Sequence, residues 1–209
     1  MMNKTHKHLR YLTTDTKGEV AFIIEKIHRT LYAIYSQMVC KTIFITKGIK
    51  YKKGIRFRGK IQISRYPNSI ICMGNNCTFN SSSYFNYRGV NHRCILQTGK
   101  EDAQIIIGNN CGFSGVSIVA DIGVIIGNNV KVGANTKIGD RDDHPEIYAS
   151  QPAKIIIEDN VWIGMNVTIM KGVTIGKNSI IGAGAIVTKD IPANVIAAGI
   201  PCKVIKARL

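Results

Sequence analysis

The stretch from Ile157 to Val187 repeats with a period of six residues, and this period constrains the fold more than any other feature of the chain. A large aliphatic residue opens each repeat, and a turn-forming residue usually stands three places later. A period of six fits no α-helix, but it fits a parallel β-helix, in which each repeat is one short strand plus a turn. The aliphatic positions are Ile157, Ile163, Ile169, Ile175, Ile181 and Val187, and the turn positions are Asn160, Asn166, Gly172, Asn178, Gly184 and Asp190.

The same rhythm covers most of the chain, with interruptions. It starts near Ile43, breaks over residues 80–104 and returns at Ile107. Val119 and Ile126 are seven residues apart, so the extra residue near 121–123 is expected to bulge the coil and push a side chain outward. We therefore predict an all-β fold, a parallel β-helix over residues 43–191 with excursions near 80–104 and 140–154. Residues 192–209 are predicted to be an extended tail folded over the cylinder, because two prolines end the pairing.

Residues 1–42 are a basic segment that contains one predicted amphipathic helix. Over residues 16–39 the apolar positions recur with the period of 3.6 that is typical of an α-helix. They are Val20, Ile23, Ile24, Ile27, Leu31, Ile34, Tyr35 and Met38. We expect this helix to pack on the end or side of the domain, or on a neighbouring subunit. A peripheral membrane helix is the competing interpretation, because Lys, Arg and aromatic residues surround the apolar face.

The formal net charge of +15 is concentrated in the first third of the chain. Residues 1–66 hold 15 Lys and Arg against three acidic residues. Such asymmetry is typical of proteins that bind nucleic acid or an anionic membrane face. A solvated basic flank, or a site for an anionic substrate, accounts for it equally well. Nucleic acid binding is not expected, because the basic segment has the strand period and carries no recognisable reading motif.

The six cysteines form no CxxC pair and no secretory framework. Cys77 and Cys111 stand at the small inward position of a repeat, so they are expected to be buried, reduced thiols. The sequence contains neither a signal peptide nor a sufficiently long apolar run. We therefore expect a cytoplasmic protein, with residues 16–39 as the segment that would contact the inner face of the membrane.

Four phrases in the second half of the chain carry a family resemblance. They run from Asp159 to Gly164, from Gly172 to Gly176, from Ile181 to Pro192 and from Ala198 to Ile205. Together they resemble the hexapeptide-repeat O-acetyltransferases, and within them the galactoside, maltose and surface-polysaccharide acetyltransferases, over roughly residues 105–206. The resemblance implies a left-handed β-helix in a homotrimer, with acetyl-CoA bound as co-substrate between neighbouring cylinders.

His144 is the candidate general base. The catalytic histidine of the family that the chain resembles stands in a His-Pro pair in the loop before the Asp-Asn-Val-Trp-Ile-Gly coil, which matches His144 and Pro145. The chemistry agrees, because acyl transfer from a thioester to an alcohol needs a base of near-neutral pKa, and imidazole is the natural choice. Asp140, Asp142 and Asp143 resemble the Asp-x-Asp-x-His spacing of the polysaccharide branch of the family. One of them could orient His144 or bind the acceptor, and they could equally be solvated loop carboxylates.

A metal site is the other interpretation of an Asp and His cluster. We do not expect one, because clustered ligands alone are weak evidence. The related γ-type carbonic anhydrases need several histidines, whereas only His92 and His144 lie in the repeat region.

The resemblance assigns further residues by position. The acceptor-binding acidic residue of the sugar enzymes matches Asp121, where the slip in the repeat independently favours an outward carboxylate. The family's acceptor-binding asparagine corresponds to Phe113, a departure for which Ser114 or Ser117 could substitute. The backbone amide of Met165 matches the group that meets the thioester oxygen and could stabilise the oxyanion.

The CoA moiety is also assigned by the resemblance. Ala183, Thr188 and Lys189 would lie along the pantetheine, and Lys203 and Lys206 would lie near the phosphates. The family more often has arginine at the last two positions, and lysine neutralises phosphate as a point charge rather than as a planar fork. The plainer interpretations are a turn residue for Ala183 and surface charge for the lysines.

The sequence therefore predicts an acetyl-CoA-dependent O-acetyltransferase of a saccharide hydroxyl, acting by direct attack in a ternary complex. The acceptor would be a polysaccharide or lipopolysaccharide precursor or a simple sugar. Alternative acceptors are serine, an antibiotic or the amine of a nucleotide sugar. The serine alternative is weakened because the large helical domain expected ahead of the cylinder is missing. A non-catalytic β-helix binding scaffold is the alternative from another functional class.

Overall fold

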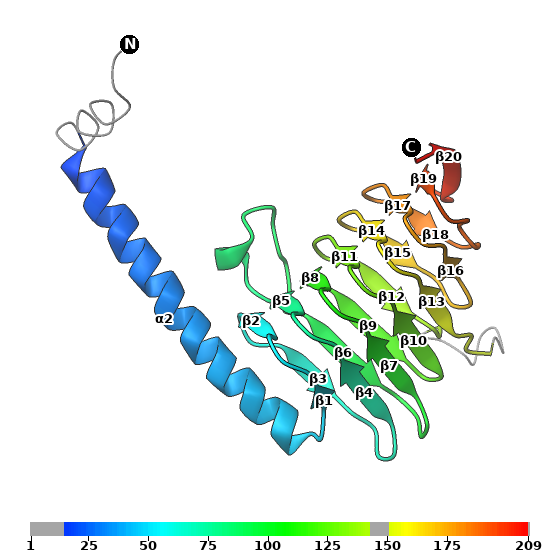
Figure 1. The fold of residues 1–209 in the computed structure, drawn as a ribbon, viewed down its shortest axis with the longest axis horizontal. Helices are drawn as coiled ribbons and strands as arrows, with labels where there is room; N and C mark the ends of the chain where they lie inside the picture. Colours follow the sequence, from blue (N-terminus) through cyan, green and yellow to red (C-terminus); the bar gives the residue numbers. More distant parts are fainter. Residues whose placement is uncertain (1–14, 143–150, 209) are drawn as a thin grey trace, which may run out of the picture.

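The protein is a left-handed parallel β-helix preceded by one long helix (Figure 1). The computed structural model describes residues 15–142 and 151–208. Helix α2, Thr16–Thr46, is capped by Asp15, whose carboxylate accepts a hydrogen bond from the Gly18 amide at 2.9 Å. Such a side-chain cap satisfies one of the amide groups that have no partner inside the first turn. The helix leads into the first coil of the cylinder.

Each coil contributes one strand to each of three sheets, and every pairing between coils is parallel. Sheet A contains β1 Lys50–Tyr51, β4 Ile70–Met73, β7 Gln104–Ile107, β10 Gly123–Ile126, β13 Ile155–Ile157 and β16 Thr174–Ile175. Sheet B contains β2 Arg56–Arg58, β5 Thr78–Asn80, β8 Gly112–Ser114, β11 Lys131–Val132, β14 Trp162–Ile163, β17 Ile180–Ile181, β19 Val195–Ala198 and β20 Lys203–Ala207. Sheet C contains β3 Gln62–Ser64, β6 Ile95–Thr98, β9 Ser117–Ala120, β12 Lys137–Gly139, β15 Thr168–Ile169 and β18 Ile186–Val187.

The interior is filled by the residues that set the six-residue period. All six aliphatic residues from Ile157 to Val187 are at most 1% exposed, so the predicted cylinder is confirmed. In the N-terminal coils a column of aromatic rings adds to the buried aliphatic residues, with Phe44 edge-on to Phe57 and the later pairs stacked. The ring centroids of Phe44 and Phe57 are 4.9 Å apart, those of Phe57 and Phe79 are 5.8 Å apart, and those of Phe79 and Phe113 are 5.0 Å apart. Phe44 belongs to α2, so this column attaches the helix to the cylinder.

The turn residues behave as the repeat predicts. Five of the six expected positions, from Asn160 to Gly184, have positive φ, where asparagine and glycine are tolerated. At the sixth, Asp190 instead accepts a hydrogen bond from the Thr174 amide at 2.7 Å. Along one edge of the cylinder the asparagine amides also bond from coil to coil, at 2.8 to 3.2 Å. This ladder runs through Asn76, Asn110, Asn129, Asn160, Asn178 and Asn194.

Two segment boundaries differ from those expected. The helix continues to Thr46 rather than ending near Val39, so Ile43 is helical and is not the first residue of a coil. The prolines of the tail do not end the pairing, because β19 pairs in parallel with β17 and β20 then folds back antiparallel on β19. The tail therefore extends and closes sheet B.

Both expected excursions leave the cylinder at corners. The first covers residues 81–94 and contains the short 3₁₀ helix η1, Ser83–Phe85, whereas residues 95–98 form strand β6. The second leaves after β12, and residues 143–150 of it lie outside the described residues. None of the helices in the described residues is both long and apolar enough to cross a membrane. The cysteines of the described chain are unpaired, and Cys77 and Cys111 are buried, as expected.

We predict that Phe79→Ala lowers the free energy of unfolding by about 3–5 kcal/mol, because the truncation leaves a cavity in the middle of the aromatic column. Tyr66→Ala is the matched control, because Tyr66 is 44% exposed and its loss should cost less than about 1 kcal/mol. Urea unfolding followed by circular dichroism measures both. Equal destabilisation by the two substitutions would show that the column does not support the fold.

Candidate functional site

The sequence-predicted site residues lie at two different corners of the three-sided cylinder. We call the turns between sheets B and C the B–C corner; it includes residues 133–136, 164–167 and 182–185. We call the turns between sheets C and A the C–A corner; it includes residues 121–122, 140–154 and 188–190. Sheet C separates the two corners.

A cavity of about 570 Å³ opens at the B–C corner. Its walls include Met165 and Ala183, which the sequence had singled out, together with Trp162 of sheet B and Asn86 and Arg88 of the first excursion. Trp162 is 57% exposed and stands on the outer face of sheet B. The cavity therefore lies between the first excursion and the last coils.

Glycines make the floor of this cavity a stack of bare backbone. A Cβ atom at Gly133 would lie 2.6 Å from the Met165 amide nitrogen, and one at Gly164 would lie 2.5 Å from the Ala183 amide nitrogen. Real Cβ atoms do not approach other atoms so closely, so only glycine allows the coils to stack here. The carbonyl oxygen of Met165 accepts a hydrogen bond from Gly184 at 2.8 Å, whereas its amide has no acceptor in the described parts of the chain. This N–H is therefore an available donor beside the cavity.

Sequence reasoning missed Asn86 and Arg88. Their segment broke the six-residue rhythm and matched no motif, so nothing in the sequence related them to the last coils. The Asn86 side chain accepts a hydrogen bond from the Arg88 amide at 3.0 Å, which shapes the turn that carries both. Arg88 supplies an exposed cation to the wall of the cavity.

At the C–A corner, Asp140 holds the inserted residue in place. Its carboxylate is fully buried and accepts three backbone hydrogen bonds, from Asp121 at 2.8 Å, from Ile122 at 2.7 Å and from Gly123 at 2.6 Å. A carboxylate that receives several amide donors is strongly bound. Asp140 thus stabilises the bulge, and every hydrogen bond that its carboxylate makes in the described residues is with the backbone of that bulge.

The inserted residue pushes out Ile122, whereas the Asp121 carboxylate is covered by neighbouring side chains. Ile122 is 43% exposed, whereas Asp121 is 7% exposed. Asp121 accepts a hydrogen bond from Arg141 at 2.8 Å and lies 3.5 Å from the ammonium of Lys100. Gly99 makes this arrangement fit, because a Cβ there would collide with the Asp121 carboxylate. The Nε of Arg141 is buried without a partner in the described chain, so this cluster retains one unused donor.

Asp142 forms an ion pair with Lys171 at 2.5 Å and is partly exposed. The second excursion leaves and returns through one neck, where the Ala153 amide donates to the Asp140 carbonyl at 2.9 Å. Asp143 and His144 belong to this excursion but lie outside the described residues. The neck fixes the point on the cylinder from which they depart.

The remaining predicted residues are divided between the corners and the tail. Ser114 is buried at the B–C corner, where its hydroxyl accepts a hydrogen bond from Asn80 at 3.2 Å. Thr188 and Lys189 are exposed at the C–A corner. Lys203 and Lys206 are exposed on β20, and Lys206 pairs with Ile196 on the sheet that carries Trp162. Phe113 is 1% exposed inside the aromatic column, so it cannot contact an acceptor.

Within the described residues, one copy of the chain places the predicted site residues at two separate corners. Met165 and Ala183 lie at the B–C corner, whereas the neck that leads to His144 lies at the C–A corner, across sheet C. Within the described residues, no group of three or more His, Cys, Asp and Glu side chains could hold a metal ion.

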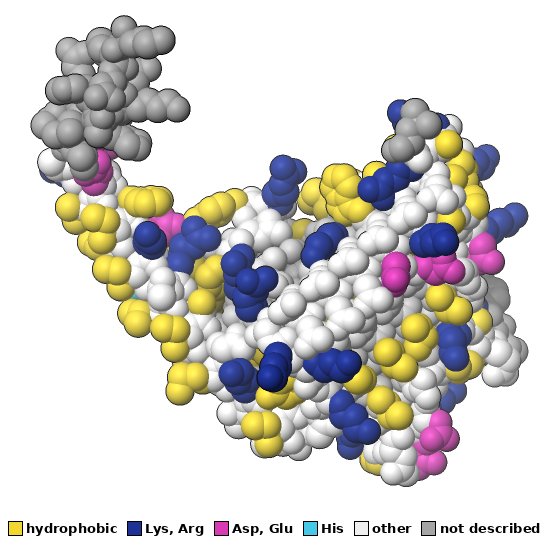
Figure 2. Space-filling model, in the orientation of Figure 1, with side chains coloured by type: hydrophobic (Ala, Val, Ile, Leu, Met, Phe, Trp, Pro, Cys, Tyr) yellow, Lys and Arg dark blue, Asp and Glu magenta, His cyan; other side chains and the backbone are white. Residues whose placement is uncertain are grey.

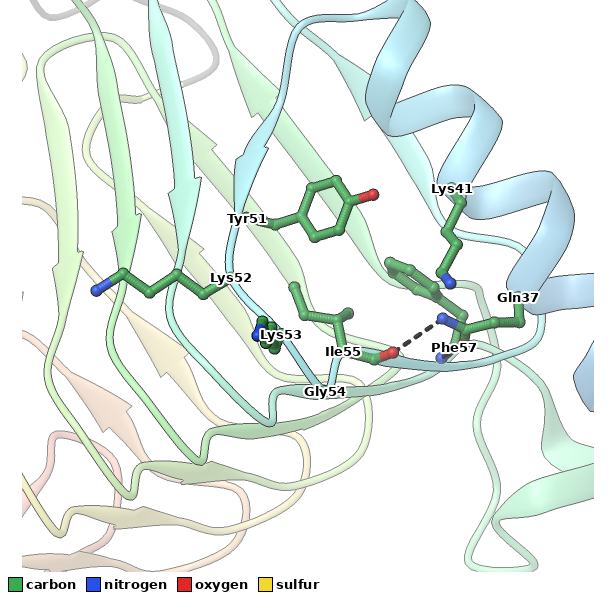
Figure 3. A pocket seen from close by; sticks show the side chains of 8 residues that line it. All are labelled: Gln37, Lys41, Tyr51, Lys52, Lys53, Gly54, Ile55 and Phe57. Atoms are coloured by element: carbon green, nitrogen blue, oxygen red, sulfur yellow. Dashed lines mark hydrogen bonds between the residues drawn. The ribbon is translucent and has the colours of Figure 1, made fainter.

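A second cavity, of about 350 Å³, lies at the foot of α2 (Figure 3). Gln37 fixes the helix there, because it donates to the Ile55 carbonyl and accepts from the Phe57 amide, both at 2.9 Å. Lys41, Lys52 and Lys53 also line this cavity, and Figure 3 shows the Lys52 side chain directed away from Lys41. The lysines do not converge on one point, so this cavity is less suited to a ligand than the one at the B–C corner.

Two family models match the chain. The bacterial transferase hexapeptide (six repeats) matches residues 154–189, and the hexapeptide repeat of succinyl-transferase matches residues 104–140. A galactoside O-acetyltransferase of Lactococcus lactis subsp. lactis (strain IL1403) is 38% identical over 138 residues, which are 63% of this chain and 60% of that protein. The chain thus spans less than two thirds of the length of this relative.

Solved structures have the same fold. The polySia specific acetyltransferase NeuO is 27% identical with a TM-score of 0.50, over 77% of this chain and 81% of that chain. A variant of AntD, an N-acyltransferase from Bacillus cereus, in complex with dTDP-4-amino-4,6-dideoxyglucose and Coenzyme A, has a TM-score of 0.62. It is 21% identical over 84% of this chain and 90% of that chain, so the likeness concerns the fold alone.

We predict that Asp140→Ala destabilises the fold by about 3 kcal/mol or more, because three backbone amides lose their acceptor and each such loss costs about 1–3 kcal/mol. Asp142→Ala is the matched control two residues further on, since it removes only a partly exposed ion pair worth about 1 kcal/mol or less. Thermal or urea unfolding compares the variants. If Asp140→Ala were as stable as Asp142→Ala, the bulge would not depend on the buried carboxylate.

Proposed function

Because the chain belongs to the hexapeptide-repeat acyltransferases of left-handed β-helix fold, we propose that it is an acetyl-CoA-dependent O-acetyltransferase that modifies a hydroxyl of a saccharide. The observation that carries the proposal is the cavity at the B–C corner, whose floor is bare backbone and beside which the Met165 amide lacks an acceptor in the described chain. A thioester arm needs such a channel and such a donor.

The cavity fits the narrow pantetheine arm of acetyl-CoA. Ala183 presents only a methyl group there, and the glycines on either side present none. Arg88 supplies a cation on the cavity wall, and Lys203 and Lys206 supply two more at the C-terminal end of sheet B. Cations at the open end of a channel attract phosphate groups. We assign the arm to the B–C corner and the phosphates to the lysines of β20, with Thr188 and Lys189 on the neighbouring corner.

The Met165 amide acts on the thioester carbonyl. As the acceptor oxygen attacks the carbonyl carbon, negative charge develops on the carbonyl oxygen. A fixed N–H donor therefore stabilises the transition state more than it stabilises the bound thioester. The donor is part of a stacked backbone turn, so it is held in position before the reaction. No reorganisation is then needed as the charge develops.

In this proposal His144 is the general base and then the general acid. Its imidazole accepts the proton of the attacking hydroxyl while the new ester bond forms, and it then donates that proton to the departing thiolate of CoA. Asp142 or Asp143 would orient the ring or bind the acceptor, together with Asp121 and Ser114. The Arg141 Nε, which has no partner in the described chain, adds a donor to this corner.

Two copies of the chain complete the site in this proposal. The B–C corner of one copy would face the C–A corner of the next, so that the Met165 amide meets the loop of His144. A homotrimer of cylinders provides three such junctions. The separation of the two sets of residues by sheet C within one chain supports this arrangement.

The cysteines support direct transfer rather than an acetyl-enzyme. Burial raises the pKa of the thiols of Cys40, Cys94 and Cys202, which keeps them protonated. Cys77 and Cys111 are fully buried in the core, away from the cavity. Six unpaired thiols also suit a reducing compartment, so we propose a cytoplasmic enzyme acting on precursors of polysaccharides.

We predict that His144→Ala lowers kcat by about 10²- to 10⁴-fold and leaves the KM for acetyl-CoA nearly unchanged, because it removes a general base and no CoA contact. His92→Ala is the control, since His92 is a partly buried histidine of the first excursion with no assigned role in the site, and the variant should retain normal turnover. Release of CoA with a panel of mono- and oligosaccharides measures both. Near-normal turnover of His144→Ala with a confirmed acceptor would exclude the proposed base.

We predict that Ala183→Phe raises the KM for acetyl-CoA by about tenfold or more, because the larger side chain fills the channel. Ala193→Phe is the matched control: Ala193 stacks on Gly176 as Ala183 stacks on Gly164, but at the corner between sheets A and B. Binding of a non-hydrolysable acetyl-CoA analogue by calorimetry measures the effect. Equal affinity of the two variants would mean that the arm does not lie at the B–C corner.

A further inference from the structure

Helix α2 presents an apolar seam that nothing in the described chain covers. Figure 1 shows the helix leaving the cylinder at an angle, and Figure 2 shows hydrophobic side chains along its outer side. The seam residues are each more than half exposed. They are Val20, Ile24, Ile27, Leu31, Ile34, Met38 and Ile45.

The spacing of the seam is that of a coiled coil. From Val20 to Lys41 the steps are alternately four and three residues, so the mean period over these three heptads is 3.5 rather than 3.6. The only polar seam position within the helix interior is Lys41, between Met38 and Ile45, and in Figure 3 its side chain leaves the helix toward the cavity at its foot. A strict 3.5 repeat keeps a narrow stripe facing another helix along the whole length. Helix α2 is 31 residues, or about 46 Å, long.

The opposite face of α2 is fixed to the domain, so the seam has a defined orientation. Ser36, Cys40 and Phe44 are fully buried on that face. Further along, the Tyr32 ring stacks on Phe85 of the first excursion, with the ring centroids 5.7 Å apart. Tyr87 adds hydrogen bonds with Glu25 at 2.7 Å and Arg29 at 3.1 Å. The domain thus holds the helix from residue 25 to residue 44 and directs the seam outward.

We propose that α2 forms a parallel, three-stranded coiled coil with the α2 helices of two other copies of this chain. The heptad alternates Val20, Ile27 and Ile34 at the d position with Ile24, Leu31 and Met38 at the a position. β-Branched residues at the d position favour three or four strands over two. The three helices must be parallel, because the copies are related by rotation in a closed ring and each helix leads into its own cylinder at the same end.

The side chains that flank the seam match a second copy better than a membrane surface. The flanking positions that the cylinder leaves open hold no Lys, Arg, Asp or Glu, so identical helices meet without repulsion between like charges; they are Ala21, Ile23, His28, Thr30, Tyr35 and Thr42. The helix has four basic and two acidic residues, whereas an interfacial helix usually has a strongly basic polar face. The proposal rests on α2 alone and is independent of the catalytic function.

Disulfide cross-linking of the full-length protein tests the pairing. Leu31→Cys and Ile27→Cys place a thiol in the seam, and each should give covalent dimers under mild oxidation in most of the protein. Phe22→Cys is the matched control, because Phe22 is 67% exposed on the same helix but faces away from the seam. It should cross-link no more than the parent chain does. Absence of seam cross-links, or equal cross-linking at Phe22→Cys, overturns the proposal.

Sedimentation equilibrium and vesicle flotation separate the remaining outcomes. The parent chain should have the mass of three copies. Ile27→Gln combined with Leu31→Gln should weaken self-association by roughly tenfold or more. If the cylinders also associate, the same double substitution should instead lower the yield of the disulfide cross-link of an added Ile24→Cys by roughly tenfold or more. Phe22→Gln should change neither. A monomeric parent chain overturns the proposal. The proposal is also overturned if the parent chain floats with phosphatidylserine vesicles, Ile27→Gln abolishes this flotation, and no seam cysteine gives a cross-link.

Discussion

The stacking of one coil's backbone directly on the next is the constraint on which the rest of the structure depends. Each coil must turn three corners in few residues, and the coils can lie at strand spacing only where no side chain intervenes at the corners. Gly164 on Ala183 and Gly133 on Met165 meet this requirement at one corner. At another corner, asparagine side chains instead bond to each other from coil to coil. The same requirement leaves a bare backbone surface with an available N–H donor at the B–C corner. The proposed catalytic donor is therefore a by-product of how the cylinder stacks, and it needs no dedicated side chain.

Departures from the stacking concentrate chemistry at the C–A corner. The single inserted residue near Ile122 would leave three amides without coil partners, and the buried Asp140 carboxylate replaces those partners. The residues after Asp140 leave the cylinder as the second excursion, so the insertion and the excursion share one anchoring carboxylate. Sequence alone grouped Asp140 with Asp142 and Asp143 as neighbours in a loop. The structure separates their roles, because Asp140 is consumed by the backbone whereas Asp142 is paired with Lys171 near the surface.

The regular part of the fold could be predicted from the sequence because its signal is local. Ile163 or Asn166 has the same role in every coil, and few folds besides a β-helix repeat every six residues. The boundary between the helix and the first coil, near Ile43, could not be predicted from the sequence. Ile43, Ile49 and Ile55 have the six-residue spacing of the coils, while Cys40 and Phe44 have a helical spacing. Only the packing of Phe44 on Phe57 shows that the helix continues. Arg88 could not be found either, since its approach to Trp162 depends on how an irregular segment folds over distant coils. The positional match to Asp121 found the right region, but the orientation of its carboxylate depends on Arg141 and Gly99, which no repeat pattern encodes.

The first excursion physically connects the helix to the cavity. Phe85 and Tyr87 pack on α2, and Asn86, between them, lines the cavity at the B–C corner. A displacement of α2 would therefore move one wall of the cavity. If the seam of α2 is covered by the same helix of neighbouring copies, assembly fixes the helix, the helix fixes Phe85 and Tyr87, and these fix Asn86 and Arg88 beside the cavity. Met165 lies at the corner where the strands of sheet C begin, and the neck of the second excursion lies at the corner where they end. A second cylinder would therefore also be needed to complete the proposed site. Self-association would then contribute twice to one site, by holding a wall of the channel within each copy and by bringing the loop of His144 from the next.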